Sequence, residues 1–254
     1  MTVVVKLGGR VQSDPRLAEA LRGMWTSLPG SLCVVHGGGD EVTAFQRQLG
    51  REPVFIGGRR VTTDDDLEVV RMVLSGSVNK RLVSMLRATG VPAAGISGED
   101  AGLLPSEPID AERFGKAGRP LTPNIDVLIA LLASGFLPVV SPVGTDITVG
   151  GCGALNINGD DAAAAIAGAL GAELWMIADV DGVLDDERAI VPEMDARQME
   201  ILVSSGAVTS GMHAKLEAGF VALHAGSPVV RIASLAAFSD RNAGTLLSLS
   251  PSTT

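Results

Sequence analysis

The chain has 254 residues, of which 46% are hydrophobic and 19% charged. This composition is too apolar and too weakly charged for a disordered chain, and the length suffices for one large domain or two small lobes. Asp and Glu outnumber Lys and Arg by 29 to 20, which gives a formal net charge of −9. Because the basic residues also form no run, we expect no binding to nucleic acid.

The cysteine content and the N-terminus indicate a cytoplasmic protein. Two cysteines, Cys33 and Cys152, cannot form a disulfide framework, which fits a reducing compartment. The first residues show neither a basic stretch nor a cleavage pattern, so no signal peptide is expected. The uncharged stretch 127–144 is interrupted by Gly135 and Pro138 and therefore predicts a helix followed by a strand, with no membrane span.

Short apolar runs alternate along the chain with longer segments of helical periodicity. A strand is expected at 3–6, a helix at 14–28, a strand at 32–35 and a helix that opens at 36–39 and extends to 49. A hairpin is expected at 54–62, followed by a long helix at 64–89 with three aspartates in its first turn. Further strands are expected at 92–96, 137–141, 173–178 and 229–233, with an alanine-rich helix before residue 173 for which Asn158 is the natural cap.

This alternation predicts an α/β protein with a mainly parallel sheet covered on both faces. No internal repeat or low-complexity linker is found in the sequence. The glycine-rich stretch 150–153 is the expected seam between two lobes, although one sheet can run through both.

Glycine-rich turns at 6–9, 36–39 and 179–182 each follow a predicted strand. Ligands of a parallel sheet bind at the carboxyl ends of its strands, where glycine lets backbone N–H groups approach an anion. For any single turn, the alternative is that glycine merely closes the backbone. Two such turns together, with Lys6 at the mouth of the first, favour an anion site.

The lysines are informative because the chain otherwise uses arginine for positive charge, with sixteen Arg and four Lys. Lys6 ends the first strand, and Lys215 lies near the start of a predicted helix. A compact ammonium group suits a point contact with a phosphoryl oxygen, whereas a guanidinium is a wide fork. An exposed surface position is the alternative for both. The Walker, protein kinase and dinucleotide motifs do not occur.

Polar residues cluster before the alanine-rich helix, in the segment Asn156 to Asp161. A helix cap accounts for Asn158 alone. Asp160 is then left to position the two lysines or a metal ion. None of the three histidines has the spacing of a metal site, and no catalytic histidine is expected.

Together these motifs resemble the amino acid kinase family. The similar segments follow the family's order through nearly the whole chain, and each is weak alone: 6–9, 35–39, 58–62, 78–80, 95–98, 135–140, 156–160, 179–184 and 211–215. The resemblance implies a three-layer αβα sandwich with an open, mainly parallel sheet. It also implies that residues 1–153 form an N-terminal lobe for an acyl amino acid and for dimerisation, and that residues 154–254 form an ATP-binding lobe.

Within the family, the pattern is similar to the enzymes that phosphorylate the γ-carboxylate of N-acetyl-L-glutamate with ATP and Mg²⁺ in arginine biosynthesis. The resemblance implies that Lys6 and Lys215 contact the transferred phosphoryl group and that Asp160 orients them. It assigns substrate binding to Gly38, Gly39, Arg60 and Asn156. It assigns nucleotide binding to Lys6, Gly8, Gly9, Asp179, Val180, Asp181, Gly182, Val183, Leu184 and Lys215, and it assigns no direct metal ligand.

Some positions depart from the family pattern, namely Lys116, Ser210 and His213. The chain starts at its first strand, without the additional helix of the hexameric, arginine-inhibited type, which favours a homodimer without arginine feedback. Two alternatives stay open: a kinase for carrier-protein-linked aminoadipate in lysine biosynthesis, and a nucleotide-binding protein of the same fold that has lost turnover. The retained lysine pair argues against the second.

Overall fold

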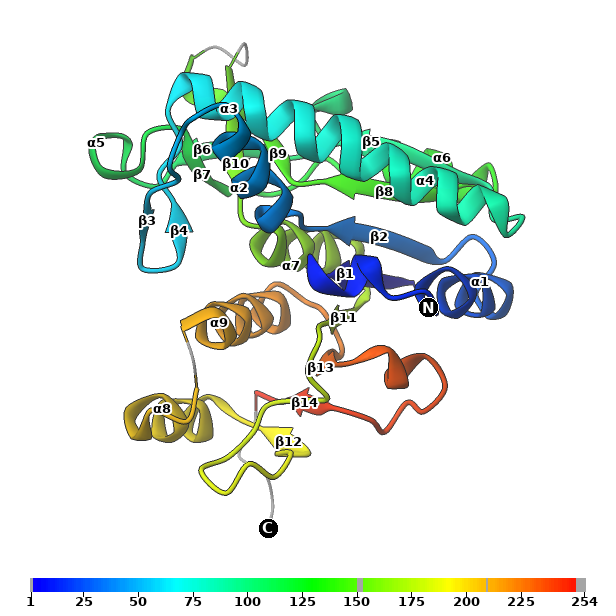
Figure 1. Ribbon diagram of the computed structural model, residues 1–254. Coiled ribbons are helices and arrows are strands. Elements are labelled where there is room, and N and C mark those ends of the chain that lie inside the picture. Colours follow the sequence, from blue (N-terminus) through cyan, green and yellow to red (C-terminus); the bar gives the residue numbers. More distant parts are fainter. Residues whose placement is uncertain (1, 150–152, 209, 250–254) are drawn as a thin grey trace.

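The computed structural model describes residues 2–149, 153–208 and 210–249. Helices cover both faces of a central sheet (Figure 1), in which all neighbouring strands are parallel except β13 and β14. The strand order is β12 (Glu193–Met194), β14 (Thr245–Leu247), β13 (Val230–Ala233), β11 (Glu173–Ile177), β1 (Val3–Leu7), β2 (Leu32–His36), β8 (Leu137–Ser141) and β5 (Ala93–Ser97). The predicted αβα sandwich with an open, mainly parallel sheet is confirmed.

Alternating side chains of the central strands fill two apolar cores, one on each face of the sheet. Val3 and Val5 of β1 belong to one core, together with residues of α1 (Leu17–Ser27) and α4 (Asn79–Ala88). Val4 belongs to the other core, with residues of α7 (Gly159–Leu170) and α9 (Ser210–His224). Each core combines residues from both sides of the expected seam, and one sheet runs through both lobes. Gly150, Gly151 and Cys152 of that seam lie outside the described residues.

Local sequence signals place most of these elements correctly. The six predicted strands coincide with β1, β2, β5, β8, β11 and β13 to within one residue at each end. Asn158 caps α7 as predicted, because its side-chain oxygen accepts a hydrogen bond from the Asp160 N–H group at 2.8 Å. Gly57 and Gly58 form the turn between β3 (Phe55–Ile56) and β4 (Arg59–Arg60) and have φ values of 56° and 78°, which glycine adopts without strain.

The predicted long helix consists of three segments. It begins at α3 (Asp64–Val70), where Thr63 and Asp66 form a reciprocal capping box. A π-helical segment, Arg71–Val78, follows and leads into α4. Periodicity predicts the helix but not this change of winding, because a π segment inserts one residue without altering the composition.

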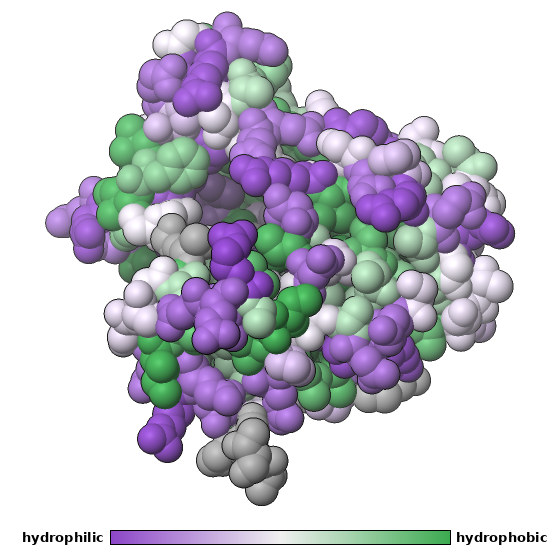
Figure 2. Space-filling view, turned by 60° about the horizontal axis from the view of Figure 1, so that its bottom comes forward, coloured by the Kyte–Doolittle hydropathy of each residue, from purple (hydrophilic) through white to green (hydrophobic). Residues whose placement is uncertain are grey.

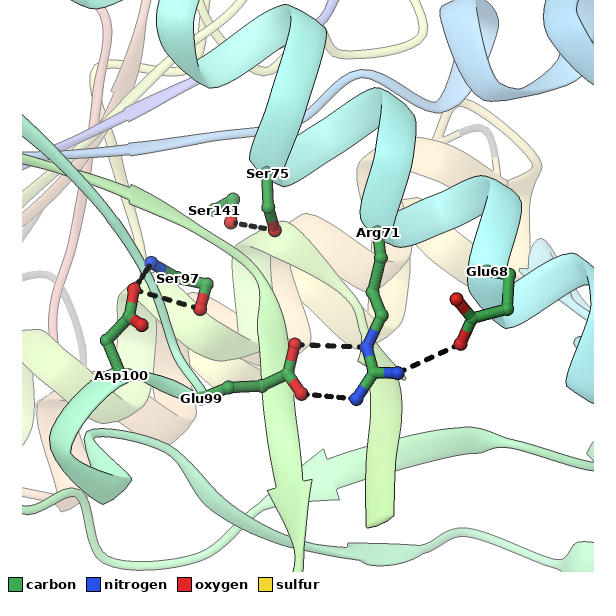
Figure 3. Close-up of polar contacts among 7 residues, drawn as sticks. All are labelled: Glu68, Arg71, Ser75, Ser97, Glu99, Asp100 and Ser141. Atoms are coloured by element: carbon green, nitrogen blue, oxygen red, sulfur yellow. Dashed lines mark hydrogen bonds and ion pairs between the residues drawn. The ribbon is translucent and has the colours of Figure 1, made fainter. Parts of the chain in front are cut away.

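Polar contacts brace the π-helical segment against the neighbouring strands (Figure 3). The Arg71 guanidinium donates to both carboxylate oxygens of Glu99, at 3.2 and 2.5 Å, and to Glu68 at 2.9 Å. The hydroxyl groups of Ser75 and Ser141 lie 2.7 Å apart. The segment is therefore fixed at the carboxyl ends of β5 and β8.

A small closed barrel stands beside the main sheet and was not predicted. Its strands are β6 (Pro105–Pro108), β7 (Ala117–Pro120), β9 (Val143–Asp146) and β10 (Gly153–Ile157). They are short and contain proline or glycine, so they carry little strand periodicity. The remaining elements are α2 (Gly39–Gln48), α5 (Ala111–Phe114), α6 (Asp126–Ala133), α8 (Ala196–Ser205), η1 (Arg10–Ser13), η3 (Asp100–Gly102), η4 (Ile147–Val149) and η5 (Leu235–Phe238).

The surface mixes polar and apolar side chains, as the face in Figure 2 shows. Among the described residues, no helix combines the length and the apolar character needed to cross a bilayer. Cys33 is buried in β2, and burial raises the pKa of its thiol to about 12.

Candidate functional site

Three predicted catalytic residues meet at one point. Lys6 shares a face of β1 with Val4, so it points toward α7 and α9. The Nζ atom of Lys6 lies 2.8 Å from Oδ1 of Asp160 in α7, and the Nζ atom of Lys215 in α9 lies 2.8 Å from the same oxygen. All three side chains are buried. Residues far apart in sequence thus form a compact triad, Lys6–Asp160–Lys215.

Asp160 and the two ammonium groups attract each other, whereas the two ammonium groups repel each other. Burial alone would raise the pKa of Asp160, but the two ammonium groups outweigh it and hold the pKa well below its usual range. Burial and the charge of Lys6 lower the pKa of Lys215 to about 8, against the opposing effect of Asp160. Two ammonium groups and one carboxylate leave a net positive charge available to an anionic ligand.

A cavity of about 240 Å³ adjoins the triad. Apolar side chains such as Val70 and Leu74 contribute to its walls. At its edge, a Cβ on residue 159 would lie 3.4 Å from Cε of Lys6, so Gly159 leaves close access to that side chain. Six predicted site residues line the cavity: Lys6, Gly9, Gly38, Gly39, Arg60 and Asn156.

Gly8 of the first turn and Gly38 of the second are held in different ways. The Gly8 N–H group donates to the Ile177 carbonyl at 2.9 Å and is engaged in the sheet. Gly38 has φ 155° and ψ 25°, a conformation that favours glycine. A Cβ at this position would lie 2.7 Å from Cδ2 of Leu74, so the π-helical segment also requires glycine here.

Arg60 presents a buried guanidinium at the cavity wall. Its Nη2 atom donates to the Gly39 carbonyl at 2.9 Å and to the Thr43 hydroxyl at 2.7 Å, and its Nη1 atom donates to Gln46. The guanidinium carbon also lies 4.7 Å from the centre of the Phe55 ring. The charge is therefore held in place before any ligand arrives.

Asn156 and Arg59 connect the β3–β4 hairpin to the rest of the site. Asn156 of β10 donates from Nδ2 to the buried Thr62 hydroxyl at 3.0 Å. Arg59 of the hairpin lies on Asp161 of α7, with Nη1 and Oδ2 2.8 Å apart. Neither Arg59 nor Asp161 stands out in the sequence, since an acidic residue in a first helical turn is ordinary.

The predicted nucleotide residues do not all line one cavity. Lys6 and Gly9 line the first cavity, whereas no residue of the loop 179–184 does. Asp179 and Asp181 instead line a second cavity, of about 820 Å³. Asp179 accepts a hydrogen bond from Arg10 at 3.1 Å. Val183 is buried, and its N–H group donates to the Thr245 hydroxyl at 2.8 Å.

The departures from the family pattern make ordinary contacts where they are described. Nζ of Lys116 lies 3.6 Å from Asp64, and the His213 ring lies 3.7 Å from Glu217, four residues further along α9. In the part of the chain that the structure describes, no three His, Cys, Asp or Glu side chains are grouped as a metal ion requires. The first cavity thus has fixed positive charge on two sides, at the triad and at Arg60.

Comparisons with known proteins point to one family. Residues 1–234 match the model of the amino acid kinase family. The chain is 43% identical to the acetylglutamate kinase of Geobacillus stearothermophilus over 236 residues, which are 92% of this chain and 90% of that protein. It is 44% identical to the acetylglutamate kinase of Rubrobacter xylanophilus, over 89% and 87% of the two chains. The crystal structure of smu.665 from Streptococcus mutans superimposes with a TM-score of 0.87 at 26% identity, over 98% and 99% of the two chains. The chain belongs to the amino acid kinase family.

Proposed function

We propose that this protein transfers the γ-phosphoryl group of ATP to the γ-carboxylate of N-acetyl-L-glutamate. One observation carries the proposal: two buried ammonium groups share one carboxylate oxygen, each at 2.8 Å, beside a cavity that also holds the Arg60 guanidinium. The identity of 43% to an acetylglutamate kinase over 92% of the chain supports the choice of substrate.

The reaction needs charge stabilisation more than proton transfer. A glutamate-type carboxylate, with an ordinary pKa of about 4.3, is ionised at neutral pH and attacks without a general base. What remains is to hold the reacting groups in line and to neutralise charge on the moving phosphoryl group. Lys6 serves the γ-phosphoryl side and Lys215 the leaving side, while Asp160 keeps both ammonium groups in place.

The remaining cavity residues bind the acyl amino acid. Arg60 pairs with a substrate carboxylate, because its charge is fixed at the wall by Thr43 and the Gly39 carbonyl. Asn156 binds the backbone of the substrate, and Gly38 and Gly39 offer N–H groups to the anion. Residues 1–153 thereby form the substrate lobe.

Residues 154–254 form the nucleotide lobe. Gly9, Lys215 and the loop 179–184 contact ATP, with Gly8 permitting the close approach of β1 to that loop. Mg²⁺ would enter as Mg-ATP and would neutralise charge on the phosphates. Among the described residues no three His, Cys, Asp or Glu side chains are grouped to hold it, and Oδ1 of Asp160 already accepts two ammonium groups.

The protein is proposed to act as a homodimer in the cytoplasm. β5 ends the sheet, and large apolar side chains on the segments around it are at least 41% exposed, namely Met72, Ile129 and Phe136. A second copy covering them would remove this apolar area from water. Light scattering coupled to gel filtration distinguishes the dimer from a monomer.

Turnover tests the proposal directly. Purified protein with Mg-ATP should release ADP with N-acetyl-L-glutamate and far more slowly with glutamate, N-acetylaspartate, N-acetylaminoadipate or carbamate. Lys6→Ala should abolish the release. Arg60→Ala should raise the KM for N-acetyl-L-glutamate by at least about 30-fold, for a lost charge-assisted contact of about 2 kcal/mol, and the KM for ATP much less. A preference for another carboxylate, or an equal rise in both KM values, would overturn the assignment.

A further inference from the structure

His36 and Asn79 form a buried polar pair, and the proposed function assigns no role to either residue. Both are fully buried, and neither lines the cavity. Nδ2 of Asn79 lies 3.2 Å from Nε2 of His36, and Nδ1 of His36 lies 2.8 Å from the Gly37 carbonyl oxygen. The pair therefore connects the start of α4 to the glycine turn behind the cavity.

The surroundings of the pair determine which atoms donate. Nδ2 of Asn79 also lies 2.8 Å from the Val139 carbonyl, which only accepts, and Oδ1 of Asn79 accepts from Lys80 at 3.0 Å. The Asn79 amide thus donates to Nε2 of His36, and the ring proton resides on Nδ1 and is donated to Gly37. Burial lowers the pKa of His36 to about 4, which keeps the ring neutral.

The Gly37 carbonyl accepts a second hydrogen bond, from Nε2 of Gln12 at 3.0 Å. With both lone pairs engaged, the peptide plane between Gly37 and Gly38 cannot rotate freely. In a trans peptide the N–H group points opposite to the carbonyl. The Gly37 carbonyl faces His36 and Gln12, neither of which lines the cavity, whereas Gly37 and Gly38 both line it. Within the described residues, the Gly38 N–H group has no acceptor.

We propose that His36 is a positioning residue, which holds the Gly37 carbonyl so that the Gly38 N–H group faces the reacting anion. The inference rests on the proposed function for the identity of that anion. The donor is fixed before the reaction, so it stabilises developing charge without reorganisation. His36 itself touches neither substrate.

The π-helical segment makes this arrangement possible. Each residue of an α-helix turns the next by about 100°, so one inserted residue rotates everything after it by that angle. Asn79 is the first residue after the segment, and the insertion brings its amide to His36. The side chains of Leu74 and Val78 of the segment occupy the space that a Cβ at Gly38 would enter. Arg71 and Ser75 hold the segment in place (Figure 3).

Two substitutions of His36 distinguish the hydrogen bond that Nδ1 donates to Gly37 from the one that Nε2 accepts from Asn79. The amide nitrogen of asparagine can replace Nδ1, so His36→Asn keeps the donor to Gly37. The amide oxygen of glutamine can replace Nε2, so His36→Gln keeps the partner of Asn79 and loses that donor. With both substrates saturating, kcat of His36→Gln should fall at least about 10-fold below that of His36→Asn, since a lost oxyanion donor lowers kcat by roughly 10²–10³. The KM values should change by less than about 3-fold.

Ser227→Ala is the matched control, because its buried hydroxyl donates to the Ala172 carbonyl at 2.6 Å outside the site. It should lower the melting temperature and leave kcat unchanged. Equal kcat in the two His36 variants, or kcat losses that follow melting temperature alone across all three variants, would overturn the inference.

NMR of the free protein provides a readout that needs no turnover. With ¹⁵N-labelled histidine, His36 should show the neutral Nδ1–H tautomer between pH 5.5 and 8, and the Gly38 amide resonance should shift in His36→Gln more than in His36→Asn. An Nε2–H tautomer, titration in that range or equal Gly38 shifts would overturn the inference. If these signals are as expected but N-acetyl-L-glutamate is not phosphorylated, the positioning of Gly38 is supported and the proposed function alone fails.

Discussion

At the residue scale, the position of Lys6 is tightly constrained. Its Nζ atom lies 2.8 Å from Oδ1 of Asp160, its side chain is buried, and a Cβ added at Gly159 would contact its Cε at 3.4 Å. A guanidinium is longer and carries its charge over a planar fork. Arginine at this position would therefore displace the charge from the place where Lys6 is proposed to meet a phosphoryl oxygen.

We predict that Lys6→Arg damages kcat nearly as much as Lys6→Ala. A displacement of about 1 Å costs on the order of 10²-fold in rate. The measurement is kcat for the two variants and the unmodified protein, with circular dichroism melting curves as the control for folding. Near-normal turnover in Lys6→Arg would mean that Lys6 does not contact the transferred group.

The second lysine predicts a pH dependence. Burial and the charge of Lys6 lower the pKa of Lys215 to about 8, so its ammonium group is lost as the pH rises through that value. If this charge is needed, kcat/KM falls tenfold per pH unit above about 8. Lys215→Arg stays charged and should be less active but without that alkaline fall. A flat profile up to pH 9.5 in the unmodified protein would contradict the assignment.

The same group affects stability in the opposite sense. The pKa of Lys215 in the unfolded chain is near 10.4, so between pH 8 and 10.4 the unfolded state binds more protons than the folded one. The contribution of Lys215 to the free energy of unfolding therefore rises with pH in this window while activity falls. A loss of activity there is thus not explained by this group unfolding the protein.

At the scale of elements, the sequence predicts what depends on local pattern. Continuous apolar runs give β1, β2 and β8, because buried parallel strands need no alternation. The barrel strands escape prediction, since β6 and β7 are four residues each and include proline. Their pairing is set by tertiary contacts between distant segments, which no local window contains.

The sequence likewise predicts one part of the candidate site and misses another. The order of the motifs was enough to select Lys6, Asp160 and Lys215. In the structure, the ammonium groups of both lysines contact the same oxygen of Asp160. Motif order could not reveal that Arg59 and Asp161 pair across 102 positions, because neither residue type is unusual in its own segment. Motif order also could not show that the loop 179–184 does not line the first cavity, because this depends on how the turns at the end of the sheet are arranged in space.

The Arg59–Asp161 pair predicts how the β3–β4 hairpin behaves. The side chain of Arg59 is 33% exposed, so the pair contributes at most about 1 kcal/mol to holding the hairpin on α7. Because Arg59 and Arg60 are adjacent at the cavity, Arg59→Met should raise the KM for N-acetyl-L-glutamate up to about 5-fold and leave the KM for ATP within about 2-fold.

Arg51→Met is the matched control for the hairpin. Arg51 pairs with Asp65 at 2.7 Å in a more exposed setting, and it does not line the cavity. Arg51→Met should change neither the KM for N-acetyl-L-glutamate nor the KM for ATP. Similar effects of the two substitutions would show that loss of positive charge near the site, and not the link to α7, is responsible.

At the scale of the whole molecule, the two proposed lobes share one sheet and both apolar cores. β11 of the C-terminal part pairs with β1 along its full length, and Trp175 and Ile177 of β11 lie in one core with Val5 of β1 and Val34 of β2. β10, at the start of the C-terminal part, pairs with β7 and β9 of the barrel. Neither lobe therefore has a complete core of its own.

We predict that the full chain unfolds in a single cooperative transition and that residues 154–254 alone do not fold. In the isolated fragment, β11 would lose β1, and one face of its sheet would expose Trp175, which is 4% exposed in the whole chain. Urea unfolding followed by far-ultraviolet circular dichroism and by tryptophan fluorescence should give one midpoint for both signals. The fragment should show no cooperative melting. Two separated transitions, or a fragment with a sharp melting curve, would mean that the lobes fold independently and that the shared cores contribute little to stability.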